Sequence, residues 1–114
     1  MRNYRDYTKY KNHKVETSEG TFDSKKEYKR WTELKLLERS GRITKLQRQV
    51  PYLLVPTQRT ETVTERAVKY IADFVYERDG KVVVEDTKGF KTPDYIIKRK
   101  LMLFFYGIEV REIV

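Results

Sequence analysis

The sequence predicts an α/β fold, in which a small mixed sheet of about four strands is flanked by two helices in the order αβββαβ. Three observations support this prediction. Residues 24–41 have the pattern of a capped helix, residues 68–88 have that of a β-hairpin, and a second capped helix begins at Thr92 and leads into a last strand. The 114 residues suffice for one domain, so we expect a single domain over residues 15–114, preceded by a basic arm over residues 1–14.

The arm carries five basic side chains against a single acid, and tyrosine recurs at every third position from Tyr4 to Tyr10. It either contacts a polyanion or stays a solvated tail, and the sequence favours neither alternative. Because the arm has no apolar core, we expect no secretory signal, and a cytoplasmic location is the simplest one.

Residues 15–22 are expected to form a short ribbon, and the first helix follows it. Ser24 and Glu27 have the spacing of a capping box, which satisfies free backbone N–H groups at the start of a helix. Gly41 is expected to end the helix. The apolar face of this helix comprises Tyr28, Trp31, Leu34 and Leu37, which recur at helical spacing.

The sequence pattern of residues 43–88 predicts three strands. Residues 43–55 are extended, and Pro51 indicates an edge or irregular strand because proline cannot donate a hydrogen bond to a ladder. Residues 56–66 are polar and rich in threonine, which indicates a loop or a mobile flap. Two further strands follow at residues 68–76 and 81–88.

The second helix is predicted to begin with Thr92 as its cap and Pro93 at its first position, and Gly107 is expected to stop it. Residues 108–114 then form a last short strand. The apolar face of this helix is expected to comprise Ile97, Leu101, Phe104 and Phe105.

Composition excludes several classes of protein. Lysine and arginine number 25 against 17 aspartates and glutamates, so the net charge of +8 indicates a polyanionic partner, nucleic acid first, rather than a membrane. The absence of cysteine excludes a disulfide scaffold and a cysteine-ligated zinc site, and a single histidine excludes a multi-histidine metal site. No stretch approaches the ~18 apolar residues of a membrane span.

The predicted hairpin contains the candidate catalytic residues. Its turn at Asp79-Gly80 sets a register that places Asp73 directly opposite Asp86, on one face with Lys88. Two facing carboxylates repel each other, so the pair costs stability unless a divalent cation lies between them. Carboxylate oxygens favour Mg²⁺ or Mn²⁺. Lys88 is within reach of a phosphate or of a water beside the metal, and phosphodiester hydrolysis needs this combination.

Asp73, followed by Asp86-Thr87-Lys88 on the next strand and preceded by the helical acid Glu27, resembles the motif of the PD-(D/E)XK nuclease superfamily. The resemblance covers residues 9–113 and is closest to a small phage-encoded family of unknown function. Gln49 matches a polar position that some relatives place near the site. The runs that carry the closer resemblance are Phe22–Glu27, Tyr70–Tyr76 and Val84–Phe90.

The resemblance implies a restriction-endonuclease-like core and a role for each motif residue. Asp73 and Asp86 would bind Mg²⁺ or Mn²⁺, with the Thr87 carbonyl as a third ligand and Glu27 bound directly or through water. Lys88 would orient the attacking water or stabilise the charge that develops on the phosphate.

The residues themselves leave three alternatives open. Glu27 is also explained by the capping box alone, without a metal. Glu85 replaces Asp86 as the ligand if a bulge exchanges the two faces of the strand. The pair of Asp73 and Asp86 is also compatible with a solvated sheet face.

Basic residues in two segments are expected to contact nucleic acid, although an ordinary solvated basic surface would show the same residues. The residues in the arm are Arg2, Arg5, Lys9 and Lys11. The residues around the second helix are Lys91, Lys98, Arg99 and Lys100.

We therefore expect a Mg²⁺- or Mn²⁺-dependent deoxyribonuclease of phage DNA metabolism in the host cytoplasm. So small a domain favours recognition of branched, flap or nicked DNA, as a homodimer or with a partner subunit of a phage DNA-processing complex. A non-catalytic DNA-binding or regulatory module on the same fold is the first rival, but it would not need Asp73, Asp86 and Lys88 together. An RNA-binding protein of ribosomal type, the second rival, predicts a basic face without clustered acids.

Overall fold

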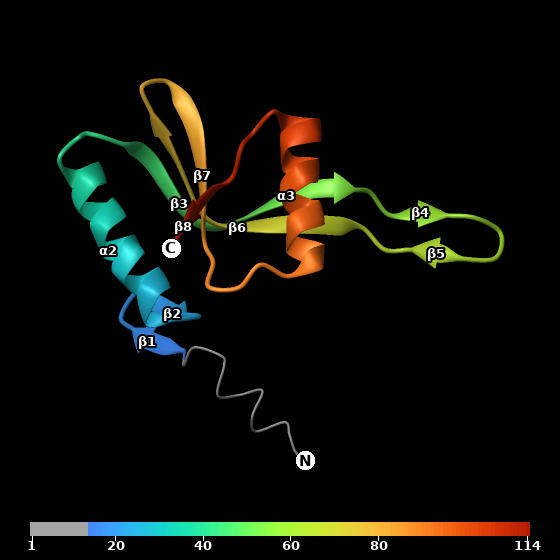
Figure 1. The fold of residues 1–114 in the computed structure, drawn as a ribbon, viewed down its shortest axis with the longest axis horizontal. Coiled ribbons are helices and arrows are strands. Elements are labelled where there is room, and N and C mark those ends of the chain that lie inside the picture. The colour runs from blue at the N-terminus through green and yellow to red at the C-terminus, as the bar shows by residue number, and fades with distance from the viewer. Residues whose placement is uncertain (1–13) are drawn as a thin grey trace, which may run out of the picture.

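The computed structural model describes residues 14–114 and contains a mixed four-stranded sheet of order β3-β6-β7-β8. Strand β8 is parallel to β7, and the other neighbours are antiparallel. In this part of the chain α2 packs on one face of the sheet and α3 on the other (Figure 1). The predicted mixed α/β fold is confirmed. The elements are β1 (Val15–Thr17), β2 (Gly20–Phe22), α2 (Lys25–Arg39), β3 (Thr44–Val55), β4 (Gln58–Arg59), β5 (Thr64–Glu65), β6 (Val68–Arg78), β7 (Lys81–Thr87), α3 (Pro93–Tyr106) and β8 (Arg111–Ile113).

Helix α2 begins and ends as the sequence predicts. The Ser24 hydroxyl accepts a hydrogen bond of 3.1 Å from the backbone N–H of Glu27, which caps the helix. Ser40 is the C-cap, and Gly41 follows with a φ of 83°, a left-handed conformation that glycine adopts without a steric cost. Strands β1 and β2 form the expected ribbon before the helix, and Phe22 of β2 packs against Tyr28 with the rings tilted by 59° and their centroids 5.0 Å apart.

The β6–β7 hairpin has the predicted turn. Asp79 and Gly80 both have positive φ values, 53° and 76°, as the tightest two-residue turn requires. The resulting register pairs Arg78 with Lys81 and continues to the pair of Phe74 and Glu85.

Strand β3 is the edge strand that Pro51 indicates, but the prediction of a loop or mobile flap over residues 56–66 was wrong. Strands β4 and β5 pair there and extend the β3–β6 ribbon as a finger that projects from the body (Figure 1). The Thr60 hydroxyl accepts hydrogen bonds from the N–H groups of Thr62 and Val63 and closes the turn. Local threonine hydrogen bonds thus order a segment that buries no apolar core.

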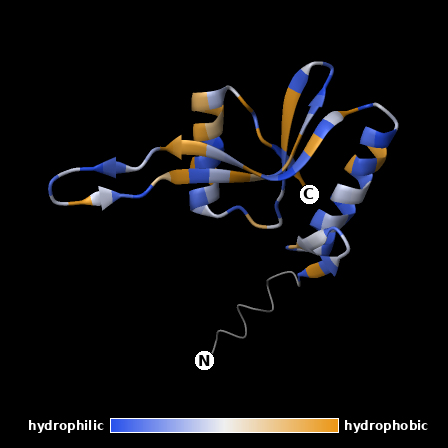
Figure 2. Cartoon of the chain, turned by 180° about the vertical axis from the view of Figure 1, so that it is seen from behind, coloured by the Kyte–Doolittle hydropathy of each residue, from blue (hydrophilic) through white to orange (hydrophobic). Residues whose placement is uncertain are grey.

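Helix α3 has the predicted cap at Thr92 and stop at Gly107, whose φ is 67°. Its predicted apolar face was wrong, because Ile97 is 58% exposed and Phe104 is 79% exposed. Phe105 is also exposed, and only Leu101 of the predicted set packs partly against the core. The helix instead buries Tyr95 and Met102, which share another face. The C-terminal half of α3 is hydrophobic, as the orange colour in Figure 2 shows.

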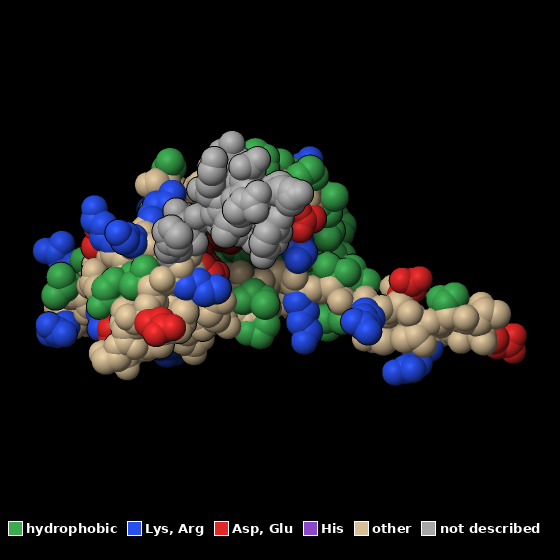
Figure 3. Space-filling model, turned by 90° about the horizontal axis from the view of Figure 1, so that it is seen from below, with side chains coloured by type: hydrophobic (Ala, Val, Ile, Leu, Met, Phe, Trp, Pro, Cys, Tyr) green, Lys and Arg blue, Asp and Glu red, His purple; other side chains and the backbone are tan. Residues whose placement is uncertain are grey.

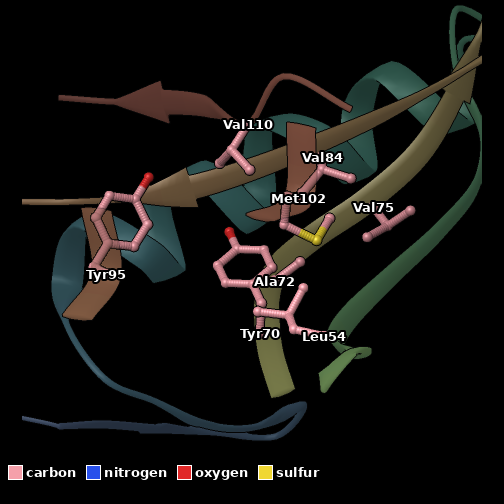
Figure 4. Packing of buried hydrophobic residues seen from close by; sticks show 8 residues of the cluster. All are labelled: Leu54, Tyr70, Ala72, Val75, Val84, Tyr95, Met102 and Val110. Carbon is pink, nitrogen blue, oxygen red and sulfur yellow. The ribbon is translucent and has the colours of Figure 1, made fainter. Parts of the chain in front are cut away.

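The core is divided by the sheet into two clusters. Between the sheet and α2 lie Leu34, Ile43, Phe74 and Tyr76. Between the sheet and α3 lie Leu54, Tyr70, Ala72, Val75, Val84, Tyr95, Met102 and Val110 (Figure 4). No helix within residues 14–114 is both long and apolar enough to cross a membrane.

Candidate active site

The site lies where β6 and β7 separate. Their ladder ends at the pair of Phe74 and Glu85, so Asp73 and Asp86 are not directly opposite each other in the ladder as the hairpin register predicts. Beyond that point β7 pairs with β8, with Asp86 beside Glu112. Asp73 and Asp86 both line a cleft at this end of the sheet.

The same point breaks the alternation of faces along β6. Ala72 packs in the cluster under α3, whereas Phe74 packs in the cluster under α2, although residues two apart in a regular strand share a face. On the neighbouring strand Gln49 has a φ of 53°, a left-handed conformation that is strained for a residue with a side chain. The local irregularity therefore lies at Asp73 and its neighbour across the ladder, Gln49.

The Asp73 carboxylate occupies the gap between the strands. Its Oδ2 accepts hydrogen bonds from the backbone N–H of Thr87 at 2.9 Å and from the Thr87 hydroxyl at 2.8 Å. Its Oδ1 lies 3.5 Å from Nε2 of Gln49, a distance too long for a strong bond. One carboxylate oxygen is thus held by β7, and the other is left for a ligand.

Asp86 is buried on the α3 side of the sheet, with 3% of its surface exposed. Its Oδ2 accepts a hydrogen bond of 2.7 Å from the Tyr70 hydroxyl, and its Oδ1 lies 3.5 Å from Nζ of Lys88. Burial and repulsion from Asp73 raise the pKa of Asp86 to about 7. The carboxylate is therefore held in place in an environment that disfavours its negative charge.

Glu27 supplies a third carboxylate from the first turn of α2. Its backbone N–H completes the helix cap, while its buried side chain accepts a hydrogen bond of 3.2 Å from Nε2 of Gln49. Burial and repulsion from Asp73 raise the pKa of Glu27 to about 7. Because Gln49 lies between Glu27 and Asp73, the helical acid and the strand acid belong to one site. The cap and the site are compatible, since they use different atoms of Glu27.

Glu85, the alternative to Asp86, lies on the opposite face of β7. It is fully buried, and Arg30 donates to both of its carboxylate oxygens at 2.8 and 2.7 Å. The Tyr76 hydroxyl donates a further hydrogen bond of 2.6 Å. These bonds occupy both oxygens of Glu85, so the structure brings Asp86 and not Glu85 to the cleft.

The carboxylates open into a cleft of about 620 Å³ that we call the acidic cleft. Figure 3 shows acidic side chains in a hollow of this face with lysine and arginine side chains around it. The residues of the acidic cleft that matter here are Lys14, Glu27, Asp73, Asp86, Thr87 and Lys88.

The donor atoms of the cleft fit a hard divalent cation. Asp73 and Asp86 each have one oxygen held by hydrogen bonds and a second that faces only a distant donor. Mg²⁺ is commonly held by one or two carboxylates and completes its shell with water and phosphate oxygens. Within residues 14–114 no three acidic or histidine side chains are grouped closely enough to hold a metal ion by themselves. The fit is therefore to a site with two carboxylates and water.

The predicted basic residues fall into different surroundings. Lys91 and Arg99 share Glu112 as their ion-pair partner, at 3.1 and 2.8 Å. Lys98 lines a smaller hollow beside Asp86, whereas Lys100 lines another on the far side of α3. The predicted contacts of the arm, Arg2, Arg5, Lys9 and Lys11, lie outside the described residues.

Two residues of the site were missed in the sequence. Tyr70 binds Asp86, but a tyrosine in a strand is ordinarily a packing residue, so its pattern carries no signal for this role. Tyr95 is buried in the core, and its ring centroid also lies 4.5 Å from Nζ of Lys88. Both tyrosines come from elements whose packing places them beside the motif.

Comparison with known proteins adds one finding. A family model described as a protein of unknown function (DUF1064) matches residues 7–112, a range that includes every residue of the site. No curated protein and no solved structure gives a match.

Proposed function

This chain belongs to the DUF1064 family, and we propose that it is a metal-dependent endonuclease that hydrolyses DNA phosphodiester bonds. The observation that carries the proposal is the meeting of Asp73, Asp86 and Lys88 where β6 and β7 separate. A buried carboxylate with a raised pKa beside a second carboxylate is costly for the fold alone, and perturbed groups of this kind gather at functional sites. The arrangement supports membership of the PD-(D/E)XK nuclease superfamily.

Each side chain has a separate task in this proposal. Asp73, Asp86 and the Thr87 carbonyl hold Mg²⁺ or Mn²⁺, and Glu27 reaches the metal through water. The metal supplies an activated water and charge neutralisation at the phosphate. Lys88 contributes a positive charge for the scissile phosphate, and its ammonium is positioned by Asp86 and by the Tyr95 ring.

DNA is the proposed substrate because the chain has a net charge of +8 and lysines line both the acidic cleft and the smaller hollow beside it. The small domain offers little surface for reading a base sequence, which supports selection of branched, flap or nicked structures in phage DNA metabolism. A homodimer or a partner subunit would extend the contact surface.

Cleavage of a supercoiled plasmid and of a synthetic four-way junction, flap and nicked duplex tests the proposal. With Mg²⁺ or Mn²⁺ we expect cleavage, which EDTA stops. Lys88→Ala should reduce the single-turnover cleavage rate by about 100-fold to 1,000-fold, because it removes a charge from the scissile phosphate. The matched control Lys81→Ala removes an equal charge from the hairpin turn and should cleave like the wild type.

A non-catalytic DNA-binding module is the second candidate, and the absence of a closely grouped set of three acids in residues 14–114 favours it. In that case the wild type binds every substrate without cutting any, and the Lys88 variant still folds. This outcome would overturn the endonuclease proposal and leave the acids with a structural role.

Metal binding should stabilise the protein more strongly as the pH rises from 6 to 8. The folded-state pKa values of Asp86 and Glu27 are raised to about 7, so these groups stabilise the metal-free fold below their unfolded pKa values. That contribution is lost as the pH rises through about 7, when both carboxylates become charged. A cation at 100 times its Kd then adds about 2.7 kcal/mol. Thermal melting with Mn²⁺ and with EDTA at each pH measures the difference, and an Mn²⁺ effect independent of pH would contradict the prediction.

A further inference from the structure

A second hollow adjoins the acidic cleft on its α3 side. This hollow has a volume of about 230 Å³, and we call it the lysine hollow. It shares Asp86 and Lys88 with the acidic cleft, so the two are continuous at the residues that would contact the scissile phosphate. The residues of the lysine hollow that matter here are Lys69, Ile71, Asp86, Lys88, Asp94 and Lys98.

The lysine hollow contains two lysines without an ion-pair partner among the described residues, whereas nearby basic side chains are paired. Lys69 comes from β6 and Lys98 from α3, and neither forms an ion pair with another described residue. Lys91 and Arg99 of the same region both pair with Glu112. In contrast, the two lysines beside Lys88 have no carboxylate partner among residues 14–114.

Besides Asp86, a second acid, Asp94, lines the hollow. Its carboxylate binds the Thr92 hydroxyl at the start of α3, and this bond lowers its pKa. Nearby Lys98 lowers the pKa of Asp94 further, although the two do not form an ion pair. Asp94 thus serves the helix start, and it opposes any anion that enters the hollow.

The two hollows would act differently on a polynucleotide. With the scissile phosphate at Lys88, the neighbouring phosphate on one side would enter the acidic cleft, where Asp73 and Glu27 would be engaged at the metal and Lys14 is paired with Asp23 at 3.0 Å. On the other side it would meet Lys69 and Lys98, which attract it. Ile71, which is 53% exposed, lines the same hollow and offers an apolar contact for the sugar.

From these observations we propose that Lys69 and Lys98 bind the backbone phosphate next to the scissile one, so that the substrate strand leaves the site through the lysine hollow. This inference rests on the proposed nuclease function for the position of the scissile phosphate. It adds a binding subsite and a direction for the strand, and it distinguishes Lys98 from the other basic residues of α3.

The test measures the affinity of the full chain for a fluorescent DNA oligonucleotide by anisotropy, in EDTA, between about 50 and 200 mM salt. Lys69→Ala and Lys98→Ala should each raise Kd about threefold to tenfold and reduce the salt slope. Because both lysines bind one phosphate, the double variant should lose about 0.7 to 0.9 in slope. Lys81→Ala removes an equal charge from the hairpin turn and should leave the slope unchanged.

Asp94→Asn provides a test of opposite sign, because removing the opposing charge should lower Kd. In cleavage assays Lys69→Ala and Lys98→Ala should raise KM while kcat stays close to that of the wild type. An equal loss of affinity in Lys81→Ala would show an effect of net charge only and would overturn the subsite. Wild-type affinity in the double variant would overturn it as well.

Failure of the subsite and failure of the nuclease proposal give different results. If the wild type cleaves DNA and the double variant binds as tightly as the wild type, the subsite is wrong and the nuclease stands. If the wild type binds but never cleaves, and the double variant binds weakly, the phosphate subsite stands and the nuclease is wrong. A wild type that binds no DNA would overturn both.

Discussion

Replacing Asp86 with asparagine should reduce DNA cleavage by about 1,000-fold or more and make the metal-free protein more stable. The loss of a metal ligand removes several kcal/mol of transition-state stabilisation, and about 1.4 kcal/mol corresponds to a factor of ten in rate. Asparagine has nearly the same shape and still accepts the Tyr70 hydrogen bond. It carries no charge to be repelled by Asp73, so we expect a gain of about 1 to 2 kcal/mol in the free energy of unfolding.

The pH dependence of this gain identifies its cause. The pKa of Asp86 is raised to about 7, so Asp86 is neutral at pH 5 and charged at pH 8. Urea unfolding in EDTA should therefore show a smaller gain at pH 5 than at pH 8, and the gain should vanish only below about pH 4, where Asp86 is protonated in the unfolded chain as well. Asp79→Asn is a matched control, because it makes the same change in the exposed hairpin turn, where asparagine is also favoured. Cleavage by Asp86→Asn within tenfold of the wild-type rate would remove Asp86 from the site.

Replacing Arg30 with methionine should lower the free energy of unfolding by about 3 to 5 kcal/mol, the largest stability effect that we expect in this chain. Arg30 donates two hydrogen bonds to Glu85, which is fully buried between α2 and the sheet. Without the guanidinium the carboxylate remains buried with only the Tyr76 hydroxyl as a partner. Urea unfolding monitored by the fluorescence of Trp31 measures the loss.

A double variant distinguishes the ion pair from simple packing. Arg30→Met combined with Glu85→Leu removes both charges and should recover most of the lost stability, because buried pairs are often replaced by apolar residues without a net cost. The control Arg39→Ala removes an exposed arginine from the end of the same helix and should change stability by less than about 0.5 kcal/mol. A double variant as unstable as Arg30→Met alone would show that the pair is not the cause.

The site was predictable to the extent that it depends on local structure. The Asp79-Gly80 turn determines the hairpin register, and the register brings Asp73 and Asp86 to the same end of two neighbouring strands. The contacts of Asp73 and Asp86 beyond the last ladder pair were not predictable from the register. A hairpin pattern contains no information about where β7 leaves β6 for β8, and that departure decides that Asp73 binds Thr87.

The finger formed by β4 and β5, and the buried face of α3, could also not be predicted from local sequence patterns. Residues 56–66 carry no apolar alternation, so their pairing into β4 and β5 follows from the longer ribbon that they extend. Along α3 the more apolar stripe, with Phe104 and Phe105, faces away from the sheet. Periodicity identifies an apolar stripe on a helix, but only the position of the helix on the sheet decides which stripe is buried.

The sequence by itself thus determined the caps of α2 and α3, the tight hairpin turn and the three residues Asp73, Asp86 and Lys88 on one end of the sheet. These features depend on bonds between residues close in the chain, whose geometry each residue type constrains. The tertiary structure decided which acid of β7 faces the cleft, which basic side chains pair with Glu112, and where Tyr70 lies. These features depend on contacts between segments far apart in the chain, and no local pattern specifies such contacts.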